Sequence, residues 1–231
     1  MPSKAFTRFL SLGLNLGLIG ISLTASYEAR AETTSQAKDL KLNQEIINNS
    51  PVLQRWLVEP PDILFDIYNT PSFRSKIRLG ITSRDQSLGY DVGVADIFLG
   101  QSPVTFSAGY QHEFSGRETD INADLKYYLL PLGGYFNIAP QIGYRYIDFF
   151  GENVSGVDLG WQGILVLSPR SADLRLSQTF TAPRSDRETS ITTLSTSFAL
   201  NNRLNIGSSI QWRRSPLRSD SRVGFYLEWR L

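Results

Sequence analysis

From Phe73 to the end of the sequence, apolar and polar side chains alternate with a period of two, and this pattern constrains the fold more than any other feature. In the segment DINADLKYYL, residues 120–129, the odd-numbered positions are apolar, while the even-numbered positions are polar or carry Tyr128. Successive side chains of a β-strand point to opposite faces. Such a segment therefore predicts a strand with one apolar and one polar face.

Ten segments share this alternation, and each has about the length of roughly 9–11 residues that a tilted strand needs to cross a bilayer. They are residues 73–84, 87–99, 103–114, 120–129, 135–147, 156–167, 171–181, 188–200, 203–213 and 222–231. After residue 31 no apolar run reaches the roughly 18 residues of a membrane helix, so a membrane protein of this sequence has to be a closed barrel. We predict an all-β fold, a single antiparallel up-and-down transmembrane β-barrel of about ten strands.

The connections between these segments differ in chemistry, and we expect short turns at one end of the barrel and longer, charged loops at the other. The expected turns contain Gln101-Ser102, Leu132–Gly134, Pro169-Arg170 and Asn201-Asn202. The expected loops are FSGRET, DFFGENVSG, APRSDRE and RRSPLRSDS. This asymmetry is typical of outer-membrane barrels, and an even strand number places both termini in the periplasm.

The size of the apolar side chains indicates that the apolar face points outward. It carries too much aromatic volume for a barrel of this size, because about eight strands already leave only a filled interior. The polar face carries Gly80, Gly93, Gly109, Gly160, Gly207 and Gly224. We expect aromatic girdles from Phe114, Tyr146, Phe180 and Trp212 toward the loops and from Phe73, Phe98, Phe198 and Trp229 toward the turns. The alternative is a soluble lipocalin-like ligand-binding barrel with an apolar interior.

Residues 1–31 have the features of a signal peptide. Lys4 and Arg8 precede an uncharged run from Phe9 to Ala25, and Ala29-Arg30-Ala31 forms an A-x-A cleavage site. Cleavage would change the formal net charge from +1 to −1, with 20 basic against 21 acidic residues. No basic footprint for nucleic acid then remains. The absence of cysteine excludes disulfides and zinc–thiolate sites.

We predict that residues 32–72 form a helical segment before the barrel, called the prefix, which lies in the periplasm. Ser50-Pro51 is an N-cap followed by proline at the first helical position. A helix is roughly 10–12 Å wide and should not fit inside a barrel of this size. We therefore expect residues 50–70 to lie across the periplasmic mouth as a partial lid, with Trp56, Leu57, Leu64 and Ile67 against the rim.

Charged side chains of both signs fall on the polar face of the predicted strands, and we expect them to line the lumen. They are Lys76, Arg78, Asp91, Glu113, Asp124, Lys126, Arg145, Asp158, Asp173, Arg175, Arg213, Arg222, Glu228 and Arg230. Mixed signs favour a salt-bridged interior, because unpaired charges in a narrow lumen are costly. An unopposed basic ring would instead indicate an anion-selective pore.

Three positions disagree with the alternation. Asp96 interrupts the lipid face of the second strand, and Pro140 removes an N–H from the middle of the fifth. A β-bulge is the expected remedy at both. The segment 188–200 has Ser and Thr on both faces, and the pattern offers no explanation for this.

The sequence gives little support for catalysis, and it predicts neither a cofactor nor a metal site. The single histidine, His112, falls on the lipid-facing side, while Glu113 points the opposite way. An omptin-like protease needs a histidine and acidic residues that converge at the outer mouth, and a deacylase needs a Ser–His–acid set. Ser115 with His112 is too weak a pattern for the latter.

The C-terminal segment VGFYLEWRL, residues 223–231, resembles the terminal strand that the barrel-assembly machinery recognises in outer-membrane proteins. It ends in Leu231, where that signal commonly ends in an aromatic residue. The helical prefix and the segment PLGGYFNIAPQIGYRY resemble uncharacterised cyanobacterial outer-membrane barrels. The resemblance implies an outer-membrane location, outer-membrane lipid as surroundings and the assembly machinery as a partner.

Two functions remain open on these grounds, and they share the fold. One is a structural or anchoring barrel with a closed, charge-paired lumen, and the other is a narrow passive channel for small solutes. An outer-membrane hydrolase is a further alternative.

We predict that the mature protein begins at Glu32 and is recovered from the outer-membrane fraction as a heat-modifiable band on a gel. N-terminal sequencing of that band checks the cleavage site. Recovery as a soluble periplasmic protein would contradict the prediction.

Overall fold

The computed structural model describes residues 44–58, 63–84, 87–216 and 219–231. The predicted signal peptide, residues 1–31, and the first part of the prefix lie outside these residues. The chain divides into two units, Met1–Pro61 and Asp62–Leu231. The second unit contains the barrel.

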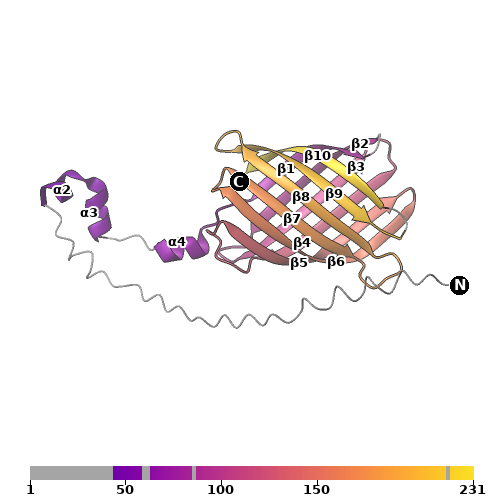
Figure 1. The fold of residues 1–231 in the computed structure, drawn as a ribbon, viewed down its shortest axis with the longest axis horizontal. Helices are drawn as coiled ribbons and strands as arrows, with labels where there is room; N and C mark the ends of the chain where they lie inside the picture. The colour runs from indigo at the N-terminus through magenta and orange to yellow at the C-terminus, as the bar shows by residue number, and fades with distance from the viewer. Residues whose placement is uncertain (1–43, 59–62, 85–86, 217–218) are drawn as a thin grey trace, which may run out of the picture. The chain divides into compact units, whose positions relative to one another are not determined.

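Ten antiparallel strands form a closed barrel in which each strand pairs with its neighbour in sequence and β1 pairs with β10 (Figure 1). The strands are β1 (Lys76–Arg84), β2 (Ser87–Phe98), β3 (Val104–Glu113), β4 (Glu118–Tyr127), β5 (Phe136–Phe149), β6 (Glu152–Ser168), β7 (Ala172–Thr181), β8 (Thr189–Ala199), β9 (Leu204–Arg214) and β10 (Ser219–Arg230). Lys76 opposite Arg230 and Ser83 opposite Val223 are the outermost pairs of the closing ladder. The predicted fold class is confirmed.

The end of the barrel where β1 begins and β10 ends is called the base, and the opposite end is called the top. The predicted difference in loop length between them is wrong. The base has connections at residues 99–103, 128–135, 169–171 and 200–203, whereas β5 and β6 at the top are joined through Phe150 and Gly151 alone. Both have positive φ, 52° and 83°, as a two-residue hairpin turn requires. The predicted loop DFFGENVSG is mostly strand, because Ile147 and Val154 continue the inward-facing pattern and are buried.

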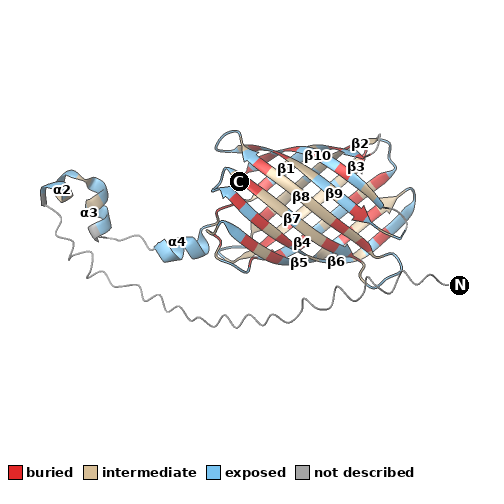
Figure 2. Ribbon diagram, viewed as in Figure 1, coloured by how far each residue is buried: buried red, intermediate tan, exposed pale blue. Residues whose placement is uncertain are grey.

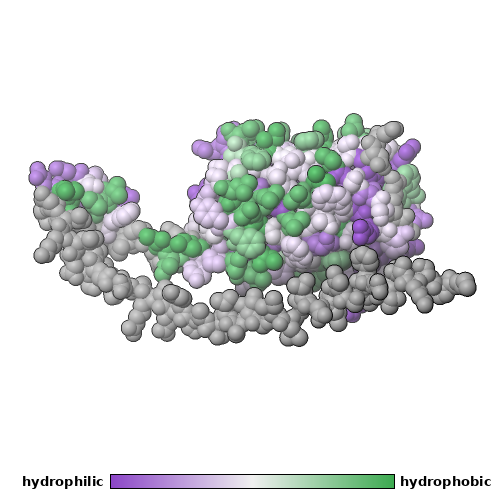
Figure 3. Space-filling view, viewed as in Figure 1, coloured by the Kyte–Doolittle hydropathy of each residue, from purple (hydrophilic) through white to green (hydrophobic). Residues whose placement is uncertain are grey.

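The outer surface of the barrel is apolar, and the inner surface is polar. Leu79 and Ile81 are each 60% exposed, whereas Lys76 in the same strand is 2% exposed. Figure 2 shows this alternation along the strands, and Figure 3 shows hydrophobic residues on the outside of the barrel. An apolar exterior around a polar interior is the arrangement of a transmembrane barrel. A lipocalin-like barrel with an apolar interior does not fit it.

Two predicted girdle residues lie inside the barrel, so their assignment to the lipid face is wrong. The first strand begins at Lys76 and not at Phe73, and the Phe73 side chain is 3% exposed within the barrel core. Phe98 packs against that core. It points inward because the second strand changes register before it.

That change of register is the β-bulge expected at Asp96. The pairing of β2 with β3 shifts between Val94 and Ile97, and Asp96 has a φ of 53°. The bulge turns the Asp96 side chain from the lipid side to the interior, where it is 0% exposed.

The expected bulge at Pro140 is wrong, because Pro140 faces Trp161 in an unshifted register. The pairing of β4 with β5 ends at Lys126 and Gln141, so Pro140, the residue next to Gln141, has no partner in this ladder. Proline has no backbone N–H, and at this position the β4–β5 ladder has already ended, so no hydrogen bond of that ladder is lost.

Hydroxyl groups on the outer face of β8 form hydrogen bonds to the neighbouring strands, which explains how this face can carry Ser and Thr. Gln178 Nε2 donates to Ser190 Oγ at 2.8 Å, and Thr192 donates to the same glutamine. Thr196 and Ser208 share a hydrogen bond of 3.2 Å. These polar groups have partners on the protein surface itself.

The described residues before the barrel include the helices α2 (Gln44–Asn49), α3 (Pro51–Val58) and α4 (Ile63–Asn69). The predicted cap is confirmed, because Ser50 Oγ accepts from the Leu53 N–H at 3.3 Å and Ser50 O accepts from Gln54 at 3.1 Å. No helix in the described part of the chain is long and apolar enough to cross a membrane.

Helix α4 is fastened to a connection at the base. The N–H groups of Leu132 and Gly133 donate to the carbonyls of Tyr68 and Ile67 at 3.2 and 2.8 Å. Leu64 and Ile67 remain 43% and 44% exposed. The lid formed by residues 50–70, with Trp56 and Leu57 at the rim, stays a prediction.

We predict that Leu227→Arg lowers the free energy of unfolding by about 2–4 kcal/mol, because the lipid-facing Leu227 lies in the middle of the β1–β10 ladder, paired with Leu79 and Ile206. Urea titration in lipid measures the change. Ser219→Arg, on the same strand at the top, is the matched control, with an expected loss of about 0–1 kcal/mol. Equal losses would show that Leu227 does not face the bilayer interior.

Candidate functional site

The lumen is the candidate functional site, and at its base it is filled by apolar side chains. Phe73 lies 4.7 Å from Tyr128 and 5.7 Å from Phe98, measured between ring centroids. The cluster is Phe73, Tyr128, Leu132, Ala139, Ile164 and Val166, with Phe98 packed against it. We call these residues the apolar plug.

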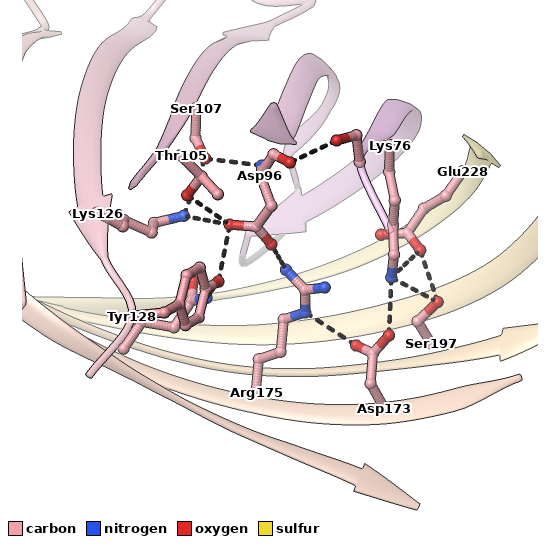
Figure 4. A network of polar contacts seen from close by, with 12 residues as sticks. Lys76, Asp96, Thr105, Ser107, Lys126, Tyr128, Asp173, Arg175, Ser197 and Glu228 are labelled. Carbon is pink, nitrogen blue, oxygen red and sulfur yellow. Dashed lines mark hydrogen bonds and ion pairs between the residues drawn. The ribbon is translucent and has the colours of Figure 1, made fainter. Parts of the chain in front are cut away.

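Above the plug, the carboxylate of Asp96 is the centre of a polar network (Figure 4). It accepts a hydrogen bond from Tyr128 Oη at 2.9 Å, pairs with Lys126 Nζ at 3.5 Å, and also pairs with Arg175. The bulge is held by Ser75 and Ser107, because Ser75 Oγ donates to Asp96 O at 2.6 Å and the Asp96 N–H donates to Ser107 Oγ at 3.1 Å. One buried carboxylate thus joins strands β2, β4 and β7.

Asp173 extends this network toward the β1–β10 closure. Arg175 Nε donates to Asp173 at 2.9 Å, and Asp173 accepts from Lys76 Nζ at 2.9 Å. Lys76 also pairs with Glu228 at 2.8 Å, and Ser197 Oγ donates to the same glutamate at 2.6 Å. Lys76 is 2% exposed, and its charge is therefore compensated within the barrel rather than by water. We call the Asp96 and Asp173 contacts together the base network.

The middle of the lumen contains a polar cavity of about 170 Å³. Arg78 pairs with Asp91 at 2.6 Å and lies 5.3 Å from the centre of the Tyr226 ring. Arg145 pairs with Asp120 at 3.2 Å and with Asp158 at 3.4 Å. Charges of both signs therefore face one another across the cavity, which favours mutual pairing over a basic ring.

Glycine at position 207 makes room for Tyr226 in the lumen. A Cβ at this position would lie 2.2 Å from the tyrosine ring. The Tyr226 hydroxyl donates to the backbone carbonyls of Thr196 and Ser208 at 3.0 Å each. Tyr226 thus packs against the inner wall over Gly207, beside Arg78.

The top of the lumen is crossed by a cluster of buried ion pairs. Arg84 pairs with Glu113 at 2.5 Å, with Asp220 at 3.2 Å, and with Glu118. Arg213 pairs with Glu118, and Arg222 pairs with the same carboxylate at 2.7 Å. Three guanidinium groups thus share these acids. We call this set the top cluster.

The structure places all the predicted lumen residues on the inner face of the strands, and all but Arg230 form ion pairs. The pairs not yet mentioned include that of Asp124 with Lys126 at 3.5 Å. Arg230 lies at the base, where it donates to the backbone carbonyls of Arg170 and Asn201. Inward residues absent from the predicted lumen set are Arg84, Asp96, Glu118, Asp120, Tyr128 and Asp220, although the alternation already placed Asp120 and Tyr128 on the polar face. All except Asp96 share the parity of the predicted residues in their strands, so the alternation alone could have found them.

The described side chains do not assemble the hydrolase constellations considered from the sequence. His112 Nδ1 lies 2.9 Å from Thr119 Oγ1 on the outer face, next to Tyr90 and Tyr110. Glu113 lies inside, where Arg84 pairs with it and Ser115 Oγ donates to it at 3.1 Å. Among the described residues, no group of three or more His, Cys, Asp or Glu could hold a metal ion.

No protein-family model matches the sequence, and no curated protein matches it. Solved structures with some likeness include the KdgM porin and the NanC porin. Each is 8% identical with a TM-score of 0.44, and the match covers 68% of this chain and 99% and 100% of theirs. The outer membrane protein Omp33 of Acinetobacter baumannii is 14% identical with a TM-score of 0.32, over 68% of this chain and 98% of its own. Sequence identities and TM-scores this low do not support any inference about function.

We predict that Asp96→Asn lowers the free energy of unfolding by about 3–5 kcal/mol, because the amide leaves the charges of Lys126 and Arg175 poorly compensated in a buried place. Urea titration in lipid measures the loss. Asp186→Asn, an exposed acid in the β7–β8 loop, is the control and should change stability by less than about 0.5 kcal/mol. A loss at Asp96 as small as the control's would show that the base network does not stabilise the barrel.

Proposed function

We propose that this protein is a bacterial outer-membrane barrel with its termini in the periplasm, and that it serves as a closed structural or anchoring barrel. The observation that carries the proposal is the filling of the lumen at both ends. The apolar plug and the base network occupy the base, the top cluster occupies the top, and a cavity of about 170 Å³ lies between them.

The energetics of the ion pairs support a closed lumen. Opening a path at the top would separate Arg84, Arg213 and Arg222 from the buried Glu118, and opening one at the base would separate Arg175 from Asp96. Removing one partner from a buried pair costs about 3–5 kcal/mol. A passage for solutes would require several such pairs to separate at once.

A narrow passive channel is the second candidate, and the polar lining of the central cavity favours it. Arg78, Asp91, Asp120, Asn122 and Asp124 line that cavity. Small ions would pass only if the long Arg and Lys side chains at either end moved aside together. The two candidates therefore differ in conductance and not in fold.

We predict that the purified full-length protein, folded and inserted in planar bilayers, produces no stepwise current above the bare-membrane baseline. A heat-shifted gel band of the same preparation establishes that the barrel is folded. Steady single-channel currents from the unmodified protein would contradict the closed-barrel proposal and support the passive channel.

We predict that deletion of residues 32–70 leaves a folded barrel whose conductance is equal to or higher than that of the full chain. The deletion removes α4 and its two hydrogen bonds to the connection at Leu132 and Gly133, but none of the ladder pairs. The heat shift and the bilayer recording check both halves of the prediction. Loss of folding, or a lower conductance, would show that the prefix belongs to the barrel core.

A further inference from the structure

The base of the barrel carries a groove of about 750 Å³ that is lined by four arginines. Arg74 precedes β1, Arg170 and Arg203 lie in two connections, and Arg230 ends β10. Leu200 and Leu231 line the same groove. We call this site the rim groove.

The arginines of the rim groove have no acidic partner among the described side chains. Among the residues that the structure describes, none of these four arginines forms an ion pair, either with an acidic side chain or with the terminal residue Leu231. The acids of the base network, Asp96, Asp173 and Glu228, are buried and already paired with lysines and Arg175. The groove therefore presents net positive charge at one rim of the barrel.

Arg230 gives an independent indication of a ligand site. It is 8% exposed, and its two terminal nitrogens donate to the carbonyls of Arg170 and Asn201. Its Nε is buried and has no hydrogen-bond partner in the described part of the chain. A buried N–H of a charged group usually has an acceptor, so an anionic oxygen at this place would complete its bonding.

The backbone holds the groove in a fixed shape before any ligand arrives. Arg230 N–H donates to Arg203 O at 2.8 Å, and Arg170 N–H donates to Ser72 O at 2.9 Å. The first bond links β10 to the connection at residues 200–203, and the second links the connection at residues 169–171 to the segment before β1. A pre-formed cationic site loses less conformational freedom on binding than a mobile one.

The groove is also amphipathic. Leu200 and Leu231 are 60% and 59% exposed beside the arginines. Guanidinium groups match the geometry of phosphate oxygens, and exposed leucines at a membrane boundary contact acyl chains. A soluble phosphate would use only the first of these features.

We propose that the rim groove binds the phosphodiester headgroup of an anionic phospholipid in the leaflet that faces the base. The inference rests on the proposed membrane placement, in which this leaflet is the periplasmic one. Arg74, Arg170 and Arg203 supply charge, Arg230 supplies the buried Nε donor, and the two leucines contact the glycerol and first acyl carbons.

The test uses the full-length protein in detergent, titrated with phosphatidylglycerol or with phosphatidylcholine of the same acyl chains, with bound lipid counted by native mass spectrometry. The rim variant is Arg74→Gln, Arg170→Gln and Arg203→Gln. The control variant is Arg117→Gln, Arg184→Gln and Arg187→Gln, which removes the same charge from exposed connections at the top. Phosphatidylglycerol affinity should fall at least about tenfold in the rim variant alone, and phosphatidylcholine should bind weakly throughout.

Equal loss in the two variants, or equal binding of the two lipids, would overturn the proposal. Competition by glycerol phosphate at the same concentration as the lipid would also overturn it, since the source would then be a soluble phosphate. If the triple variant does not fold, Arg203→Gln alone replaces it, and an unchanged affinity in that variant counts against the site. Single-channel currents in bilayers would contradict the closed-barrel proposal, but they would not contradict lipid binding at the rim groove.

Discussion

Closure of the ladder between β1 and β10 leaves no unpaired backbone edge toward lipid, and it also determines which side chains meet inside. Successive side chains of a strand point to opposite faces of the sheet. The register of strand pairing therefore determines which side chains form the inner surface. Arg78 lies opposite Glu228 in the closing ladder and opposite Gly93 on the other side. The small neighbour leaves space in which the guanidinium reaches Asp91.

The narrow interior makes charge compensation the next constraint. A charge that points inward cannot be surrounded by bulk water, so it needs partners of opposite sign with good geometry. The barrel meets this need with shared acids: Glu118 forms ion pairs with three arginines, and Asp96 forms ion pairs with both Lys126 and Arg175. Such sharing ties distant strands together, and it makes the lumen resistant to opening.

The alternation of the sequence was sufficient to predict ten strands, the outward apolar face and the inward position of the charged residues. It could not give the partners, because Lys76 and Asp173 are 97 residues apart and meet only through the closed sheet. It misplaced Phe73, which continues the pattern in sequence but lies before the first ladder pair and turns into the core. It overestimated the top loops, because β5 and β6 extend past the predicted boundary with their inward residues still buried.

The base network and the rim groove have a common physical origin. Lys76, Lys126 and Arg175 point inward and require every described acid at the base, namely Asp96, Asp173 and Glu228. Among the described side chains no acid then remains for Arg230, which lies two residues after Glu228 and bonds to backbone carbonyls instead. Closing the lumen with ion pairs therefore leaves uncompensated positive charge at the rim. An anionic lipid headgroup is the source of negative charge that we propose for this rim.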